Sequence, residues 1–137
     1  LSDAARMRTG VRLVHVGDDA LAPLPLLRHL RKGGILALKF DRMHAGMRTR
    51  EVTFLGAPWR MPEGPLRLAA LTGAAIVPVF TRRIGFLEYE LHNYLPITLS
   101  RRPSEAELDE AAQTLANCLE SFVRAYPTQW FRFDNGQ

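Results

Sequence analysis

Cysteine is almost absent from this sequence, because Cys118 is the single thiol among 137 residues. One thiol excludes an intrachain disulfide and any metal site built from several cysteines. Long hydrophobic runs are absent too: the longest stretch without a charged residue, 68–81, has 14 residues and contains Gly73 and Pro78. A membrane-spanning helix needs about 20 apolar residues, so the sequence offers no candidate span. The arginine-bearing opening also lacks the pattern of a signal peptide.

Several common chemical motifs are also missing. The sequence contains no G-x-x-x-x-G-K-[ST], no G-x-G-x-x-G, no H-E-x-x-H and no G-x-S-x-G. These patterns mark phosphate loops, dinucleotide sites, zinc proteases and serine hydrolases, respectively. We therefore expect no metal site and no bound cofactor.

Lysine is scarce, since 16 of the 18 basic residues are arginine. The basic residues are also unevenly placed: residues 1–103 hold 16 basic and 8 acidic side chains, a net +8, whereas residues 104–137 hold 2 and 6. The planar guanidinium pairs well with phosphate and carboxylate. Two interpretations stay open, namely an arginine-rich solvated face and a surface that faces anions. A nucleic-acid partner is not expected, because no aromatic-basic interleaving and no recognition-helix pattern is present.

Hydrophobic periodicity predicts an α/β fold with a mixed, mostly parallel sheet and helices packed on it. Length and a hydrophobic content of 47% fit a single domain, 1–137, with its own core. The predicted strands are 11–16, 35–40, 51–55, 75–81 and 86–92, and the predicted helices are 21–32, 65–72 and 104–126. Pro78 places its strand at an edge or a bulge. The sequence Ser104-Glu105-Ala106-Glu107 predicts a capping box that opens the last helix.

The turn before the second helix is a candidate anion site. A helix that opens at Gly64-Pro65 aims free N–H groups and its positive dipole end at the preceding loop. Arg60 and Arg67 lie close in sequence and would strengthen such a site. The alternative is an ordinary α/β connection with proline in the first turn.

Several stretches together resemble the C-terminal half of the bacterial lipid A biosynthesis acyltransferases, a family that includes lauroyl and myristoyl transferases and mycobacterial mannoside acyltransferases. These stretches are 41–50, Phe54-Leu55-Gly56, Pro62-x-Gly64-Pro65-x-x-Leu68-Ala69-x-x-Thr72-Gly73-Ala74-x-x-Val77-Pro78 and Tyr126-Pro127-x-Gln129-Trp130-Phe131. Pro62-Glu63-Gly64 also resembles a block of the wider glycerophospholipid acyltransferases.

The resemblance implies a partial glycerolipid-acyltransferase-like fold. It also implies acyl transfer from acyl carrier protein or coenzyme A, as co-substrate, to a hydroxyl of a lipid or glycolipid acceptor. The implied location is the cytoplasmic face of the bacterial inner membrane. In such enzymes a histidine in an H-x-x-x-x-[DE] block acts as general base. None of the four histidines here has an acidic residue five positions later; those positions hold Ala20, Gly34, Thr49 and Ile97. We therefore expect this histidine upstream of Leu1, in a longer protein, and no activity from the 137 residues alone.

The remaining site residues are expected to bind substrate rather than to do chemistry. Asp41 and Arg42 would line the cleft at the end of the 35–40 strand, and Glu63-Gly64 would meet a polar head group or the donor's phosphate. Arg60, Arg67, Arg82 and Arg83 would contact phosphate, although for Arg82 and Arg83 a solvated face is an equal alternative. A second function also stays open: a non-catalytic relative that binds anionic lipid or phosphate through its basic part.

Overall fold

The computed structural model describes residues 23–40 and 46–129, and the chain divides into two compact units, 1–36 and 37–137. In the first unit, helix α2 spans Pro23–Arg31. It ends at Gly33, whose φ is 81° and whose N–H donates to the carbonyl of Leu30. The predicted helix 21–32 is confirmed over its described residues, because glycine adopts the left-handed conformation that stops a helix. The predicted strand 11–16 lies outside the described residues.

The apolar run 35–40 is not a strand, so this prediction was wrong. Its composition suits a buried strand, but a strand also needs a neighbour with which to exchange backbone hydrogen bonds. No described segment pairs with this run. Ile35 is accordingly almost fully exposed.

The second unit opens with an antiparallel hairpin, in which β1 (Thr49–Phe54) pairs with β2 (Ala57–Pro62). Leu55 and Gly56 form the turn with φ of 51° and 78°. Positive φ at both positions is the geometry of a type I′ turn, which suits the twist of a hairpin. The sequence predicted β1 but not β2, since Pro58 and Pro62 argue against a strand. Proline is tolerated here because β2 is an edge strand of a two-stranded sheet.

Helix α3 (Gly64–Thr72) follows β2 at once and confirms the predicted helix. Pro65 stands in the first turn, where its missing N–H breaks no hydrogen bond. Gly73 ends the helix with a φ of 75°, and its N–H donates to the carbonyl of Ala69 over 2.8 Å.

A second antiparallel hairpin joins β3 (Val79–Gly85) to β4 (Glu88–Asn93). The predicted strand 75–81 is thus shifted, because β3 begins after Pro78, and upstream of it only Ile76 makes an isolated bridge, to Ile97. The mostly parallel sheet expected from the sequence is not formed by the described residues, which contain two two-stranded antiparallel sheets. The two-residue links within each hairpin force this outcome, since parallel strands need a long crossover.

The closing helix α4 (Glu105–Ala125) confirms the prediction almost to the residue. Ser104 caps it by accepting from the N–H of Glu107. The Glu107 carboxylate accepts from the N–H and hydroxyl of Ser100, so the reciprocal half of the capping box is not used. A 3₁₀ turn, η1 (Pro127–Gln129), follows.

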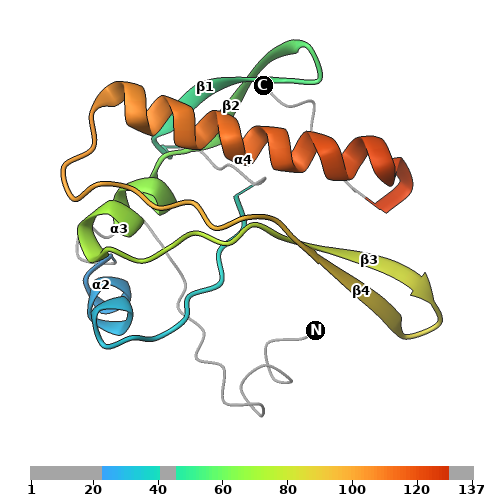
Figure 1. The fold of residues 1–137 in the computed structure, drawn as a ribbon, viewed down its shortest axis with the longest axis horizontal. Helices are drawn as coiled ribbons and strands as arrows, with labels where there is room; N and C mark the ends of the chain where they lie inside the picture. Colours follow the sequence, from blue (N-terminus) through green and yellow to red (C-terminus); the bar gives the residue numbers. More distant parts are fainter. Residues whose placement is uncertain (1–22, 41–45, 130–137) are drawn as a thin grey trace. The chain divides into compact units, whose positions relative to one another are not determined.

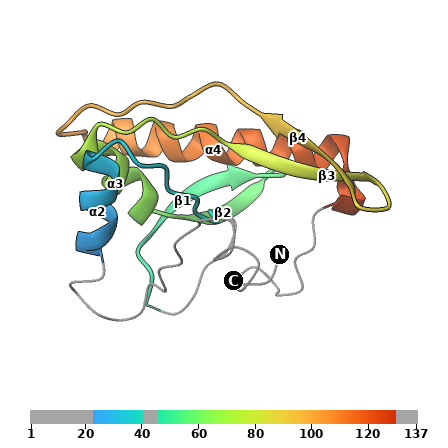
Figure 2. The ribbon, with the colours of Figure 1, turned by 90° about the horizontal axis from the view of Figure 1, so that it is seen from below.

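The core lies between α4 and the strands of this unit. One stripe of α4 is buried, and it packs with inward residues of β1, β2, α3 and β3; these are Val52, Phe54, Trp59, Met61, Leu66, Phe80, Leu108, Ala111, Ala112, Leu115, Ala116, Leu119, Phe122 and Val123. Figures 1 and 2 show α4 running along the β1–β2 hairpin. Gln113 fastens the helix to β1, because its amide accepts from the Thr53 N–H and donates to the Thr53 carbonyl.

Candidate functional site

Glu63 occupies the junction between β2 and α3 and is the charged residue found buried in the described part of the chain, with 6% of its surface exposed. Its position follows from the local sequence. Strand β2 ends at Pro62, α3 begins at Gly64, and the carbonyl of Glu63 accepts the N–H groups of Leu66 and Arg67. A buried carboxylate is unfavourable unless charged or hydrogen-bonding partners surround it.

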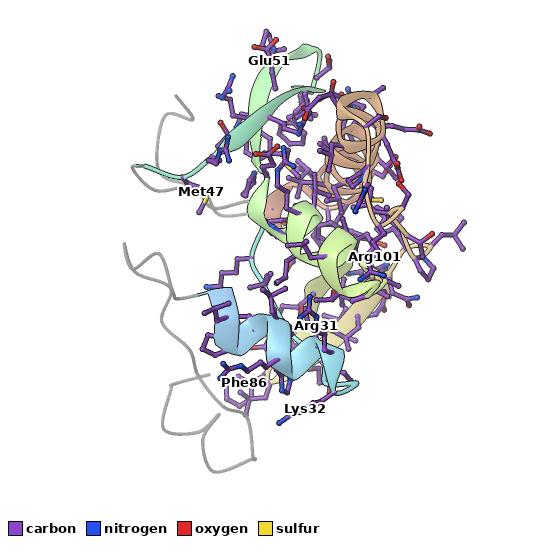
Figure 3. All side chains as sticks on the ribbon, turned by 90° about the vertical axis from the view of Figure 1, so that its left-hand side faces the viewer. Arg31, Lys32, Met47, Glu51, Phe86 and Arg101 are labelled. Atoms are coloured by element: carbon purple, nitrogen blue, oxygen red, sulfur yellow. The ribbon has the colours of Figure 1, made fainter. Side chains whose placement is uncertain are left out.

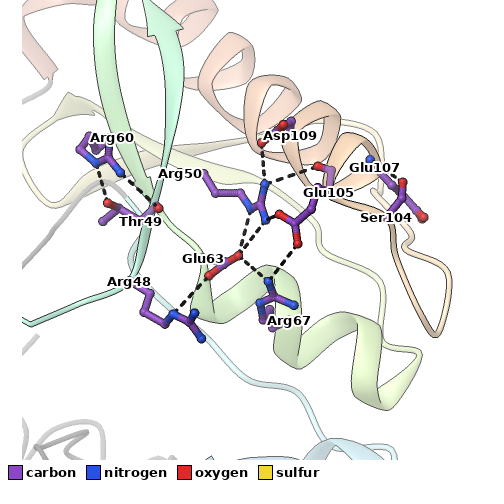
Figure 4. Close-up of polar contacts among 10 residues, drawn as sticks. All are labelled: Arg48, Thr49, Arg50, Arg60, Glu63, Arg67, Ser104, Glu105, Glu107 and Asp109. Atoms are coloured by element: carbon purple, nitrogen blue, oxygen red, sulfur yellow. Dashed lines mark hydrogen bonds and ion pairs between the residues drawn. The ribbon is translucent and has the colours of Figure 1, made fainter.

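Arginines from two elements supply those partners (Figure 4). Oε1 of Glu63 accepts from Nε of Arg50 over 3.1 Å and from a terminal nitrogen of Arg67 over 2.8 Å. A terminal nitrogen of Arg50 also lies 2.9 Å from Oε1, and Nε of Arg48 lies 3.9 Å from Oε2. The cluster therefore joins β1, the end of β2 and the first turn of α3.

Arg50 also links this cluster to helix α4. Its side chain is only 10% exposed and binds the carboxylates of Glu105 and Asp109, the latter over 2.6 Å. The hydrogen bond to Glu105 is the main cause that raises the pKa of Arg50 above its ordinary value, while burial opposes it. Arg50 is thus a fixed cation between Glu63 and the first turn of α4.

The pKa of Glu63 is lowered from its ordinary value. Burial acts in the opposite direction and is the largest single influence, but the hydrogen bonds and charges of Arg67 and Arg50 together outweigh it. The Glu63 carboxylate is consequently ionised at neutral pH and committed to arginine.

The cluster has little net charge, because three arginines face three carboxylates: Arg48, Arg50, Arg67, Glu63, Glu105 and Asp109. The cluster would therefore orient a ligand through individual guanidinium groups rather than attract it through a net charge. Arg67 is 43% exposed and Arg48 is 83% exposed, so both guanidiniums can still meet an anion. Gly64 adds open space, since a Cβ built there has no neighbour within 4 Å. The arrangement can hold a phosphate or carboxylate beside the start of α3.

Of the predicted site residues, the structure brings Glu63, Gly64 and Arg67 together, but Arg60 belongs elsewhere. Its Nε donates to the hydroxyl of Thr49 over 2.7 Å, and its guanidinium lies 3.8 Å from Glu51. Glu51 and Arg60 share the exposed face of the hairpin, where Figure 3 shows Glu51. Arg60 and Arg50 stand one residue apart in register, and the alternation of a strand sends them to opposite faces.

Arg82 and Arg83 lie on the β3–β4 hairpin, and their contacts are with residues outside the Glu63 cluster. The Arg82 guanidinium stacks 4.4 Å from the ring centre of Tyr126. Arg83 donates to the carbonyl of Gly85, and its backbone N–H donates to Gln129. Asp41 and Arg42 lie outside the described residues, so their place in the cleft stays a prediction.

Arg50 is the functional candidate that the sequence analysis missed. A signal was available, because Arg50, Val52 and Phe54 alternate along β1 and therefore share the inward face. A charged residue at such a position needs a buried partner.

Within 23–40 and 46–129 there is no cluster of three or more potential metal ligands, and no helix long and apolar enough to cross a membrane.

Comparison with known proteins identifies the class as acyltransferases. Residues 2–135 match the family described as bacterial lipid A biosynthesis acyltransferase, and the chain belongs to this family. The sequence resemblance is thereby confirmed.

Two curated relatives are named phosphatidylinositol mannoside acyltransferase, both from Mycobacterium tuberculosis. In strain CDC 1551 / Oshkosh the identity is 30% over 77% of this chain and 31% of the relative. In strain ATCC 25618 / H37Rv it is 27% over 91% of this chain and 38% of the relative. The chain thus spans about a third of the length of these relatives.

Proposed function

We propose that this chain is part of an enzyme that transfers a fatty acyl group from a thioester to a hydroxyl of a lipid or glycolipid. The observation that supports this function most is the family match over residues 2–135. The names of the two relatives favour a mannoside of phosphatidylinositol as the type of acceptor. Acyl carrier protein and coenzyme A both stay open as donors.

In the proposed reaction, the acceptor hydroxyl attacks the thioester carbonyl. A general-base histidine takes the hydroxyl proton, the new ester bond forms, the C–S bond breaks and the donor leaves as a thiol. The base would come from an H-x-x-x-x-[DE] block outside these 137 residues. We therefore propose that this chain alone does not catalyse the transfer. From the family resemblance, we also propose that the whole enzyme works at the cytoplasmic face of the inner membrane.

The described residues would contribute binding and orientation. Arg67 is the best-placed ligand contact, because it combines a partly exposed guanidinium with a fixed position on the first turn of α3. Glu63 would act behind it, since its oxygens already accept from Arg50 and Arg67. This refines the role proposed for Glu63 from a direct head-group contact to a residue that holds arginines. The ligand group that fits best is a phosphate of the donor or of the acceptor.

The test uses the complete gene product that contains these residues. Purified protein is mixed with acyl-coenzyme A or acyl carrier protein thioester and a phosphatidylinositol mannoside, and free thiol and acylated lipid are both measured. Acceptor-dependent thiol release with matching lipid acylation supports the proposal. Retained lipid binding without thiol release from either donor would instead favour the non-catalytic anionic-lipid-binding relative.

Two matched substitutions then test the site. Arg67→Gln removes a charged hydrogen-bond donor and should raise KM roughly tenfold, because one such bond contributes about 1.5 kcal/mol. Arg60→Gln removes an arginine from the other face of the hairpin and should leave KM unchanged. Equal KM values for wild type and Arg67→Gln would remove Arg67 from the binding site.

A further inference from the structure

Glu105 is the carboxylate of α4 that contacts both a buried and an exposed arginine of the cluster (Figure 4). Its Oε2 binds Arg50, and its Oε1 lies 3.6 Å from a terminal nitrogen of Arg67. Asp109 stands one turn further along α4 and, among the described residues, pairs with Arg50 and not with Arg67. The two carboxylates of α4 therefore differ in one respect, namely contact with Arg67.

Glu105 is well placed although most of its side chain is open to solvent. The side chain is 73% exposed, whereas that of Glu63 is 8% exposed. Glu105 is the first residue of α4, where the positive end of the helix dipole favours a carboxylate. Its backbone carbonyl also accepts from Arg50 over 3.4 Å. The charge of Glu105 is thus held beside Arg67 without being buried.

An anion that approaches Arg67 meets this charge. One terminal nitrogen of Arg67 already has two carboxylate neighbours, Glu63 at 2.8 Å and Glu105 at 3.6 Å. Glu63 is buried and also bound by Arg50, so it stays in place. A phosphate on Arg67 must therefore either push Glu105 aside or lie next to its negative charge. Both alternatives lower the affinity for the phosphate, because like charges repel.

We propose that Glu105 competes with the phosphate of the ligand for Arg67 and so sets the affinity of the site. Glu105 neutralises Arg67 while the site is empty and opposes the anion that replaces it. This inference deepens the proposed function and rests on its assignment of Arg67 as a ligand contact. Differences in affinity between related sites lie mostly in the dissociation rate. Glu105 therefore speeds the release of the bound phosphate group.

The sign of the effect separates this role from a purely structural one. If Glu105 only held the arginines in position, its replacement would loosen Arg67 and weaken anion binding. If Glu105 competes with the anion, its replacement strengthens anion binding even where the cluster loses stability. Glu105→Gln keeps the size of the side chain and one oxygen acceptor, so this substitution removes the charge and retains the fold.

The first experiment measures binding of pyrophosphate, a plain phosphate probe, to the complete gene product by titration calorimetry. Glu105→Gln should lower the Kd roughly two- to fivefold, which is the range expected for one exposed ion pair. The matched control Asp109→Asn removes the same charge from α4 and should change the Kd less. Added salt should reduce the difference between wild type and Glu105→Gln, because salt screens exposed charges.

Three results of this titration would overturn the proposal. They are an unchanged or higher Kd for Glu105→Gln, an equal gain from Asp109→Asn, and no pyrophosphate binding by wild type and Glu105→Gln alike. An equal gain from Asp109→Asn would mean that the overall charge matters rather than the contact with Arg67.

The second experiment asks whether the effect passes through Arg67. The double variant Arg67→Gln with Glu105→Gln should bind pyrophosphate no better than Arg67→Gln alone. A gain that persists without Arg67 would refute the competition. Acyl transfer is measured separately on the same proteins. Tighter pyrophosphate binding by Glu105→Gln without any acyl transfer would support this inference and remove the proposed reaction, whereas acyl transfer with unchanged pyrophosphate binding would do the reverse.

Discussion

Replacing Glu63 by glutamine is the most direct test of the arginine cluster. Glutamine keeps the shape of the side chain and one oxygen acceptor, so it removes the charge and little else. Glu63 accepts from Arg50 and Arg67 at distances between 2.8 and 3.1 Å. A hydrogen bond to a charged group contributes about 1.5–3 kcal/mol and a neutral one about 0.5–1.5 kcal/mol.

The expected loss in the free energy of unfolding is smaller than twice the difference between a charged and a neutral hydrogen bond. Arg50 still binds Glu105 and Asp109 in the variant, and Arg67 is 43% exposed, so water screens part of its interaction. Glu63→Gln should therefore lower the free energy of unfolding by about 1–2 kcal/mol at pH 7. Urea unfolding followed by fluorescence measures this in the 137-residue chain, since Trp59 lies in the core.

The pH dependence gives an independent check on the same reasoning. The pKa of Glu63 is lower in the folded chain than its ordinary value, so the folded state binds its proton less tightly than the unfolded state. The extra free energy of unfolding of wild type over Glu63→Gln is thus fully present above the ordinary pKa of a glutamate, about 4.3. It is lost as the pH falls through the lower pKa that Glu63 has in the folded chain. The difference between the free energies of unfolding of wild type and Glu63→Gln should therefore shrink steadily as the solution is made more acidic.

Glu51→Gln is the matched control, because it makes the same change on β1 at an exposed pair with Arg60 that is 3.8 Å long. It should alter the free energy of unfolding by less than about 0.5 kcal/mol. Two outcomes would refute the reasoning: equal effects of the two substitutions at pH 7, or a Glu63→Gln effect that does not shrink in acid. Either would mean that the cluster contributes no charge-dependent stability.

Two further predictions concern the closing helix. Ser104→Ala removes the cap on the N–H of Glu107 and should lower the free energy of unfolding by about 1 kcal/mol, which thermal unfolding followed by circular dichroism measures. Leu119 is 1% exposed in the core, so Leu119→Ala should lower it by about 2–5 kcal/mol in a urea titration, and a change below 1 kcal/mol would contradict the packing described here.

The helices were predictable because their signals are local. The stripe of apolar residues, the Ser104 cap and the left-handed stop at Gly73 depend only on neighbours within a few positions. The strands were less predictable, since pairing depends on residues that lie far away or across a turn. Strand β2 contains two prolines and was missed, whereas 35–40 has an ideal composition and does not pair among the described residues.

The residues of the candidate site likewise include some that the sequence predicted and others that only the structure assigned. The sequence alone pointed to Glu63, Gly64 and Arg67 at the start of α3, and its resemblance to the lipid A acyltransferases was confirmed by the family match. Arg60 seemed equivalent to Arg67 by its distance along the chain, and only the register of the hairpin sent it to the other face.

Sequence by itself thus determined the family, through several short motifs in order, and the helices, through local patterns, and it pointed to Glu63 at the start of α3. Tertiary structure decided which arginines reach that acid. Arg50 lies 13 positions from Glu63 and 59 from Asp109, and a strand, a turn and a packed helix are needed to bring the three side chains together. Tertiary structure also decided that Phe86 and Leu87, in the turn between β3 and β4, are left in solvent, since burial depends on what packs nearby rather than on composition.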